Sequence, residues 1–307
     1  EIARIQPPVA RWLIFTKAEK TTGASWVALA RNHLAAYAPN APIGAGTNVY
    51  FTELNSRRPP IEALDVVAYS VNPQVHAFDN SSLVETLAAQ GTTATSARQF
   101  CADKPLVVSP ITLQPRFNPN ATGPEPDAAP GQLPSQVDPR QLSLFGAGWT
   151  LGSIKYLAES GEVDSLTYYE TTGWRGVMER ATGSLLPEKF PAIAGAVFPL
   201  YHLLADVGEF AGGVVVTSVS SAPLVVESLL LEKGGRRRLL LTNYTAQPQL
   251  VTVQGLSGHL SMRPLNEDNA RQAMTEPNAY RSAAAQQLAQ LPASLSLPPF
   301  GLMCLDD

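Results

Sequence analysis

The sequence is poor in the residues that most often carry recognisable chemistry. It has two cysteines, Cys101 and Cys304, and four histidines among 307 residues. The cysteines are far apart in the chain, so they form neither a metal-ligand spacing nor a disulfide framework, and we expect two free, partly buried thiols. No histidine has a compact group of further ligands around it in the sequence. We therefore expect no metal and no cofactor.

Charge is also scarce. Charged residues make up 16% of the chain and the formal net charge is −4. No basic stripe is present, which argues against a nucleic acid as the partner. The one basic run, Arg236-Arg237-Arg238, lies between two glycines and three leucines, a setting typical of a hairpin turn that runs into a strand.

Long apolar runs and targeting segments are missing as well. No apolar run reaches the roughly 18 residues of a membrane-spanning helix, so we expect a soluble protein that does not cross a membrane. The chain opens at Glu1 with neither Met nor a signal-peptide pattern, which indicates processing or preceding residues. Bacterial cytoplasmic and secreted locations both stay open, as does the oligomeric state.

Two common enzyme motifs are absent. There is no Gly-x-Ser-x-Gly elbow, so a serine-hydrolase mechanism is disfavoured. No glycine-rich turn leads from a strand into a helix, since Ile43-Gly44-Ala45-Gly46 precedes an expected strand. A doubly wound nucleotide-binding sheet is therefore disfavoured too.

The chain does contain alternating strand and helix patterns in its first two thirds. Hydrophobic residues make up 45% of the chain, enough for a large core. Short buried strands are expected at residues 12–16, 47–53, 64–71, 106–113 and 163–170, with a further one at 192–198 and helices between them. This alternation predicts an α/β fold, a (β/α)8 TIM-like barrel over residues 1–210.

The sequence pattern changes near residue 211. Short apolar strands then alternate with turns rich in Gly, Ser and Pro up to the C-terminus. This pattern predicts an antiparallel β-sandwich domain over residues 211–307. The barrel itself is short of strands, because closure needs eight. An open half-barrel or strands upstream of Glu1 would explain the shortage, and we favour the second because an open barrel exposes its edges.

The segment of residues 163–175 carries the first candidate for chemistry. It alternates like a strand and then ends in Glu170, Gly173 and Trp174. A carboxylate at the last position of a buried strand is costly unless it has a function there. In a parallel α/β barrel this position faces the active site. Glu53, at the end of the expected strand 47–53, is the second candidate.

These two strand ends resemble those of clan A glycoside hydrolases. The resemblance is carried by Thr52-Glu53-Leu54-Asn55 and by Tyr169-Glu170-Thr171-Thr172-Gly173-Trp174. In that clan the acid/base follows the fourth barrel strand and the nucleophile follows the seventh, and a β-sandwich often packs beside the barrel. If residues 12–16 form the third strand, Glu53 ends the fourth and Glu170 the seventh. The sequence departs from the clan in placing Asn55 two positions after Glu53, not directly before the acid.

A closer resemblance covers nearly the whole chain. Residues 48–55, 72–79 and 109–119 are similar to a family with two reported identities, a metagenome-derived bifunctional glucanase-xylanase and the D-apionate lactonases. The first implies hydrolysis of β-1,4-glucan or xylan. The second implies opening of the lactone of a branched sugar acid.

The candidate roles follow from a retaining double displacement, in which two carboxylates lie about 5–5.5 Å apart. Glu170 would be the nucleophile and Glu53 the acid/base. The alternative is a glutamate that merely pairs with an arginine in the barrel mouth. We expect substrate contacts from residues near the strand ends, with Trp174 stacking on a sugar face and His76 as a possible base for a lactone: Asn55, His76, Asp79, Arg116, Tyr169 and Trp174.

The sequence thus predicts a carbohydrate-active hydrolase. The first interpretation is a retaining glycosidase, a glucanase-xylanase acting on oligo- or polysaccharide. The alternatives are a sugar lactonase on the same scaffold and a non-catalytic carbohydrate-binding relative.

Overall fold

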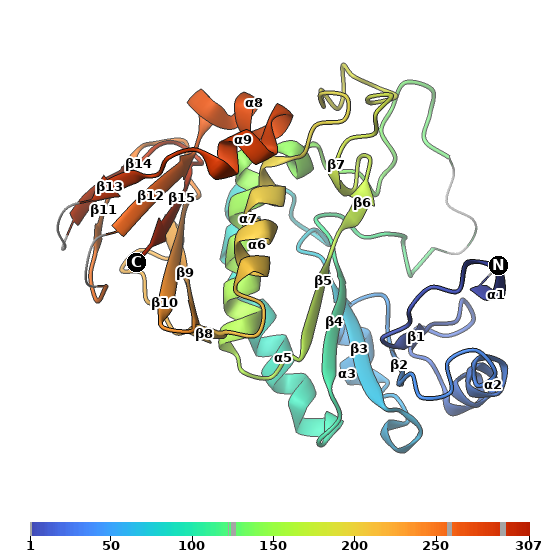
Figure 1. Ribbon diagram of the computed structural model, residues 1–307. Helices are drawn as coiled ribbons and strands as arrows, with labels where there is room; N and C mark the ends of the chain where they lie inside the picture. Colours follow the sequence, from blue (N-terminus) through green and yellow to red (C-terminus); the bar gives the residue numbers. More distant parts are fainter. Residues whose placement is uncertain (1, 122, 124–126, 257–259, 289–292) are drawn as a thin grey trace.

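Two large β-sheets with helices between them form the body of the molecule, and two pairs of strands form smaller sheets (Figure 1). The computed structural model describes residues 2–307 except 122, 124–126, 257–259 and 289–292. One sheet is parallel and comes from the N-terminal two thirds of the chain. The other is antiparallel and comes from the C-terminal third. The α/β class and the C-terminal antiparallel domain that the sequence predicts are confirmed.

The parallel sheet has five strands in sequence order and is half of a barrel. The strands are β1 (Trp12–Ile14), β2 (Ile43–Gly46), β3 (Val66–Val71), β4 (Leu106–Ile111) and β5 (Ser165–Tyr168). The elements that accompany them are α1 (Ile2–Ile5), α2 (Ala24–Leu34), α3 (Phe51–Ser56), η1 (Ile61–Ala63), α4 (Asn80–Glu85), α5 (Leu87–Cys101), η2 (Pro139–Leu142) and α6 (Leu144–Glu159). Because the strands are parallel, their carboxyl ends meet along one edge, which is where a barrel of this type places its site.

The predicted strand at residues 47–53 is wrong. The strand there is β2, and residues 51–56 are the helix α3. Every residue of β2 is buried between its neighbours, and a Cβ on Gly46 would lie 2.0 Å from the Ala68 carbonyl oxygen. At position 46 only a glycine fits so close to β3. The chain therefore ends its strand earlier than the apolar pattern of Val49, Tyr50 and Phe51 indicates. The expected strand at 192–198 is also wrong, since that segment forms a single bridge, Met178 with Val197.

Helix α6 lies between the two sheets and is buried along almost its whole length (Figure 1). Ser143 caps its start by accepting a hydrogen bond from the Gly146 amide. On the side of the antiparallel sheet, a Cβ on Gly148 would lie 2.4 Å from Thr242 Oγ1, and one on Gly152 would lie 2.2 Å from Tyr244 Oη. These glycines let the helix backbone touch the second sheet, which holds the two parts in one core.

The antiparallel sheet has six strands in the order β13-β12-β15-β10-β9-β8, and β11 pairs with β14 in a second, two-stranded sheet. Their bounds are β8 (Val214–Val216), β9 (Val226–Lys233), β10 (Arg236–Asn243), β11 (Gln249–Val253), β12 (Leu260–Leu265), β13 (Gln286–Leu288), β14 (Ala293–Leu297) and β15 (Leu302–Asp306). Helices α7 (Pro199–Glu209), α8 (Glu267–Thr275) and α9 (Pro277–Ser282) complete this part. Arg236 opens β10 directly after a Gly-Gly turn, so the predicted hairpin is confirmed.

Candidate active site

A cleft of about 360 Å³ opens at the carboxyl ends of the parallel strands. Its lining comes from the end of β1, the segment after β2, strand β4, the loop after β4 and the turn between β6 (Glu170–Thr172) and β7 (Gly176–Met178): Phe15, Asn48, Pro110, Phe117, Arg116 and Arg175. Two guanidinium groups and one amide are the polar groups of this lining. The cleft is thus shaped for an anionic or strongly polar ligand.

The backbone at Tyr169 sets the direction of Glu170. Tyr169 has φ of 56°, a left-handed conformation that a residue with a bulky side chain rarely adopts. It breaks the alternation of β5, so that Tyr168 and Tyr169 both face helix α6. Their hydroxyls pair with Ser153 Oγ at 2.8 Å and with Thr150 Oγ1 at 2.7 Å. The strand ends in this turn, and Glu170 begins β6 beside the cleft.

Glu170 forms ion pairs with both arginines of the cleft. Its Oε1 lies 3.1 Å from Arg116 and 3.0 Å from Arg175. The three side chains are partly open to solvent, 33% exposed for Glu170, 45% for Arg116 and 38% for Arg175. Both arginines use the same oxygen, and within the described part of the chain Oε2 has no hydrogen-bond partner. That second oxygen is free to take a proton from a water or a hydroxyl.

Glu53 lies elsewhere. It is in the first turn of α3, its Oε1 pairs with Lys20 Nζ at 3.1 Å, and it is not one of the residues that line the cleft. The residue that follows β2 into the cleft is Asn48. Neither glutamate is among the residues that line the cleft. Glu170 lies beside it through its ion pairs with the lining residues Arg116 and Arg175, whereas Glu53 pairs with Lys20.

The remaining predicted substrate contacts are scattered. Asn55 and His76 are exposed, on α3 and on the loop after β3. Asp79 caps α4 by accepting hydrogen bonds from Ser82, which lower the pKa of its carboxyl. Trp174 is half-buried, donates to Ser184 Oγ at 2.9 Å and packs against Phe190. Tyr169 is buried against α6. Of these residues, only Arg116 lines the cleft.

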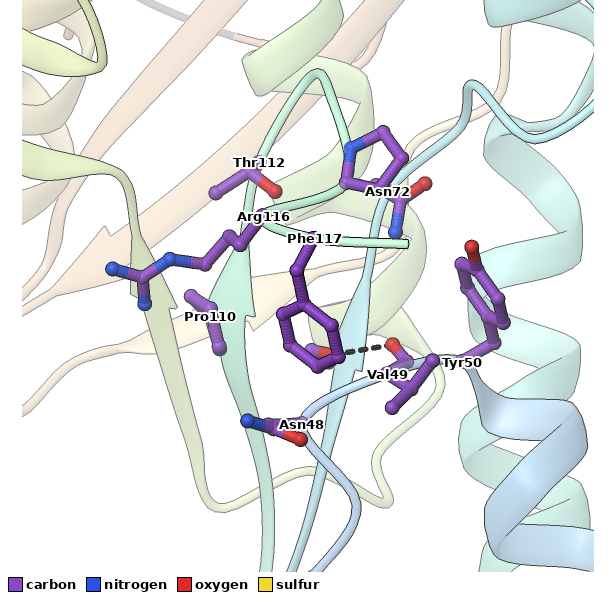
Figure 2. Close-up of a pocket in the computed structure, with 10 residues that line it drawn as sticks. Asn48, Val49, Tyr50, Asn72, Pro110, Thr112, Arg116 and Phe117 are labelled. Carbon is purple, nitrogen blue, oxygen red and sulfur yellow. Dashed lines mark hydrogen bonds between the residues drawn. The ribbon is translucent and has the colours of Figure 1, made fainter. Parts of the chain in front are cut away.

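Sequence reasoning missed three residues of this region. Asn48 stands at the start of the run Asn48–Asn55, and the sequence pattern predicts that it lies within a strand and not at the cleft. Arg175 lies within the segment 163–175, five residues after Glu170, and a glycine with φ of 85° at position 173 turns the chain between them. Asn72 follows β3 and lines a small cavity next to the cleft (Figure 2).

A buried polar network supports the loop that carries Arg116. Gln74 donates to the Leu113 carbonyl at 2.7 Å and to Asp138 Oδ2 at 2.6 Å, and it accepts from Arg140 at 2.7 Å. Burial alone would raise the pKa of Asp138, but its hydrogen bonds to Arg140 and Gln74 outweigh burial and lower that pKa. The network joins the ends of β3 and β4 and fixes the backbone from which Arg116 projects.

Family models match almost the whole chain. The D-apionate lactonase TIM barrel domain matches residues 9–212, and the D-apionate lactonase C-terminal immunoglobulin-like domain matches residues 223–305. The chain belongs to the D-apionate lactonase family. The D-apionate lactonase of Brucella anthropi is 32% identical over 217 residues, which are 70% of this chain and 34% of that protein. The chain thus spans about a third of the length of this curated relative.

Solved structures share the fold at low sequence identity. An α-L-arabinofuranosidase from Thermotoga maritima superposes with a TM-score of 0.55 at 10% identity over 95% of this chain and 62% of that one. A bifunctional glucanase-xylanase from a metagenome library gives 0.50 at 10% identity over 92% of this chain and 47% of that one. The TIM-barrel fold and the resemblance to this family and to glycoside hydrolases are therefore confirmed, and the likeness to the glycosidases is one of fold alone.

Metal-ligand clusters and membrane-spanning helices are both absent from the part of the chain that the structure describes. Among the described residues, no three His, Cys, Asp or Glu side chains are grouped as metal ligands would be. Within the same residues, none of the helices combines the length and the apolar character needed to span a bilayer.

Proposed function

We propose that this chain is a sugar lactonase, which opens the cyclic ester of a sugar acid by adding water to its carbonyl. The observation that carries the proposal is the Glu170 carboxylate held through one oxygen between Arg116 and Arg175, both of which line the cleft. The matched family and the relative from Brucella anthropi support the same reading, because both bear the name D-apionate lactonase.

The cleft favours a lactonase over a retaining glycosidase for a chemical reason. A retaining glycosidase needs a second carboxyl close to the first, one to attack and one to donate a proton. Asn48 follows β2 into the cleft, and its amide N–H donates hydrogen bonds but is far too weak an acid to protonate a leaving group. Glu53 is paired with Lys20 outside the cleft lining. Ester hydrolysis needs one base and donors for a developing oxyanion, roles that suit Glu170 and its two arginine partners.

Each residue can be given a role in a reaction sequence in which every proton removed is returned. Glu170 Oε2 accepts a proton from water while the water oxygen bonds to the lactone carbonyl carbon. The carbonyl oxygen becomes an oxyanion, which the Arg116 and Arg175 guanidiniums stabilise. The oxyanion then collapses, the bond to the ring oxygen breaks, and Glu170 returns its proton to that oxygen. The product is an open hydroxy acid. Its carboxyl group releases its proton to solvent, and the same two arginines match the charge of the resulting carboxylate.

Activity assays test the proposal directly. The chain is expected to release acid from an aldonolactone, followed with a pH indicator, and to leave aryl β-xylosides and aryl β-glucosides intact. Replacing Glu170 by Gln keeps its shape and removes the base, so kcat should fall about 10²–10⁴-fold. Glu62→Gln is the matched control, since Glu62 is exposed in η1, which precedes β3 and lies at the opposite end of that strand from the cleft.

The outcomes separate the candidate functions. Aryl glycoside hydrolysis that is lost in Glu170→Gln would support the glycosidase instead. Affinity for an oligosaccharide without any turnover would support the non-catalytic carbohydrate-binding relative. Lactone hydrolysis that survives in Glu170→Gln would remove Glu170 from the role of base.

A further inference from the structure

Two consecutive tyrosines before Glu170 face the same helix. Successive side chains of a regular strand point to opposite faces of the sheet. The rings of Tyr168 and Tyr169 nevertheless lie 5.8 Å apart between centroids, and both hydroxyls reach α6. The left-handed backbone of Tyr169 produces this exception. In a regular strand Glu170 would share the face of Tyr168 and turn towards α6. The left-handed residue therefore directs the carboxylate to Arg116 and Arg175 instead.

The conformation of Tyr169 is held at both ends of the residue. A left-handed backbone is unfavourable for a tyrosine and persists only where the surroundings fix it. At one end the Tyr169 amide donates to the Ile111 carbonyl oxygen at 3.1 Å. At the other end the ring is 7% exposed and its hydroxyl lies 2.7 Å from Thr150 Oγ1 on α6. The helix thus fixes the tip of the side chain whose backbone turns the chain towards the cleft.

A third group fixes the direction of the hydrogen bond between Tyr169 and Thr150. Thr150 Oγ1 lies 2.7 Å from the Gly146 carbonyl oxygen, which can only accept. The single hydroxyl proton of Thr150 is used there, so Tyr169 is the donor to Thr150 Oγ1. Burial raises the pKa of Tyr169 above its usual range, so its hydroxyl keeps the proton that it donates. Within the described part of the chain, Thr150 is the hydroxyl's one hydrogen-bond partner.

We infer that Thr150 and Tyr169 are positioning residues: the hydrogen bond between them holds the left-handed turn that places the Glu170 carboxylate between the two arginines of the cleft. This inference rests on the proposed function and deepens it, because it gives α6 a part in the reaction. A base must meet the attacking water in one geometry, and a misplacement of about 1 Å can slow a reaction about 10²-fold. Arg116 projects from the loop after β4, so the lactone carbonyl keeps that partner when the turn loosens.

Tyr168 is a matched control within the same strand. Its hydroxyl lies 2.8 Å from Ser153 Oγ, about one turn further along α6. Loss of either tyrosine hydroxyl removes one hydrogen bond between this strand end and the helix. Tyr168 belongs to the regular part of β5, however, and the left-handed turn before Glu170 is made by Tyr169. A change that acts through general stability should therefore affect both tyrosines alike.

The kinetic test measures kcat and KM for D-erythronolactone in the full chain. Tyr169→Phe and Thr150→Val each remove one partner at nearly constant shape, so kcat should fall about tenfold while KM stays within about threefold of the wild type. The double variant should also be about tenfold slower, because both changes remove the same bond. Thr150→Ser keeps the acceptor oxygen and should keep kcat within about threefold of the wild type, as should Tyr168→Phe. Thermal melts show whether each variant is folded.

Three results would overturn the inference and leave the lactonase proposal standing. The first is a folded Tyr169→Phe variant with the kcat of the wild type. The second is an equal fall of kcat in Tyr168→Phe. The third is a double variant that is about a hundredfold slower, since two independent effects would then multiply.

Hydrogen exchange decides the inference if the wild type hydrolyses no lactone, or if Glu170→Gln keeps its activity, because the proposed function or the proposed base then fails. The Glu170 amide donates to the Arg175 carbonyl oxygen at 2.9 Å, so its exchange reports opening of the turn. Followed by NMR, this exchange should be about tenfold faster in Tyr169→Phe and in Thr150→Val, and should change less than about threefold in Tyr168→Phe. Equal rates in Tyr169→Phe and the wild type, or equal acceleration in Tyr168→Phe, overturn the inference.

Discussion

Two clusters in this molecule are built from the same types of charged group, arginines and carboxylates, but lie in different surroundings. The cleft cluster, Glu170 with Arg116 and Arg175, is about one third to one half exposed. The interior cluster lies between α7 and the antiparallel sheet and is centred on Asp206, which is 6% exposed. Asp206 Oδ1 lies 2.6 Å from Arg263, 2.8 Å from Arg281 and 3.5 Å from Arg238.

The two clusters differ in the balance of their positive and negative charges. In the interior cluster Arg238 also pairs with Asp306 at 2.6 Å and with Glu209 at 2.7 Å, so three cations face three carboxylates. Buried charges such as those of Asp206 and Arg238 are tolerated when they are paired in this way, and the charges of this set balance one another. In the cleft cluster two cations share one carboxylate oxygen, and solvent reaches all three groups. The surplus positive charge suits a carbonyl or carboxylate that arrives from outside.

The largest expected effect breaks the interior cluster. Asp206→Asn removes the central charge and leaves Arg263 and Arg281 underpaired, so the free energy of unfolding should fall by about 3 kcal/mol. Urea denaturation measures this change. Asp103→Asn, at an exposed position, should shift it by less than about 0.5 kcal/mol. If Asp206→Asn proved as stable as this control, the interior cluster would not be structural.

A pH titration sharpens the comparison at His202, which lies beside the interior cluster. Burial, together with the charges of Arg281 and Arg263, lowers the pKa of His202 to about 4. An unfolded histidine titrates near ~6.5. Since the folded state resists protonation, this contribution to stability is fully present above about pH 6.5 and is lost as the pH falls toward 4. At pH 5 the loss is about 2 kcal/mol.

The measurement compares urea unfolding at pH 7 and pH 5 in the wild type and in His202→Gln. Glutamine can keep a donor to the Ala273 carbonyl, which His202 Nε2 contacts at 2.9 Å, but it does not titrate. The variant should therefore lose about 2 kcal/mol less than the wild type between the two pH values. Equal pH dependence in both proteins would contradict the assignment.

The smallest expected effect concerns Gln74, which is buried like the interior cluster but serves the cleft. Gln74→Met removes its hydrogen bonds to Leu113, Asp138 and Arg140 and loosens the loop of Arg116. We expect KM for an aldonolactone to rise about tenfold with a smaller change in kcat.

Gln90→Met is the matched control for that experiment. Gln90 is also buried and accepts from Ser153 Oγ at 2.6 Å, but it lies on α5 and does not contact the loop of Arg116. It should lose stability without a change in KM. A KM that rises equally in both variants would show that Gln74 acts through general stability.

Part of this site was readable from local patterns. The alternation before Glu170 and the Gly173 turn after it indicated a strand end with a carboxylate at the cleft edge. The prediction of a strand that ends at Glu53 is wrong because the apolar residues after β2 continue a strand-like pattern. In the structure β2 ends at Gly46, which packs closely on β3, and a helix follows. The position of Asp79 after a strand predicts a substrate contact, although its spacing to Ser82 equally fits the helix cap that it forms.

The sequence by itself determined the succession of parallel β/α units, the change to antiparallel strands near residue 211 and the resemblance to the lactonase family. Periodicity and turn residues act within a few positions, so they can be read in order along the chain. Only the tertiary structure decided which charged and polar groups meet. Arg116 and Glu170 are 54 residues apart, and Arg263 and Asp206 are 57 apart. Such pairs depend on how strands and helices pack, which the pattern along the chain does not determine.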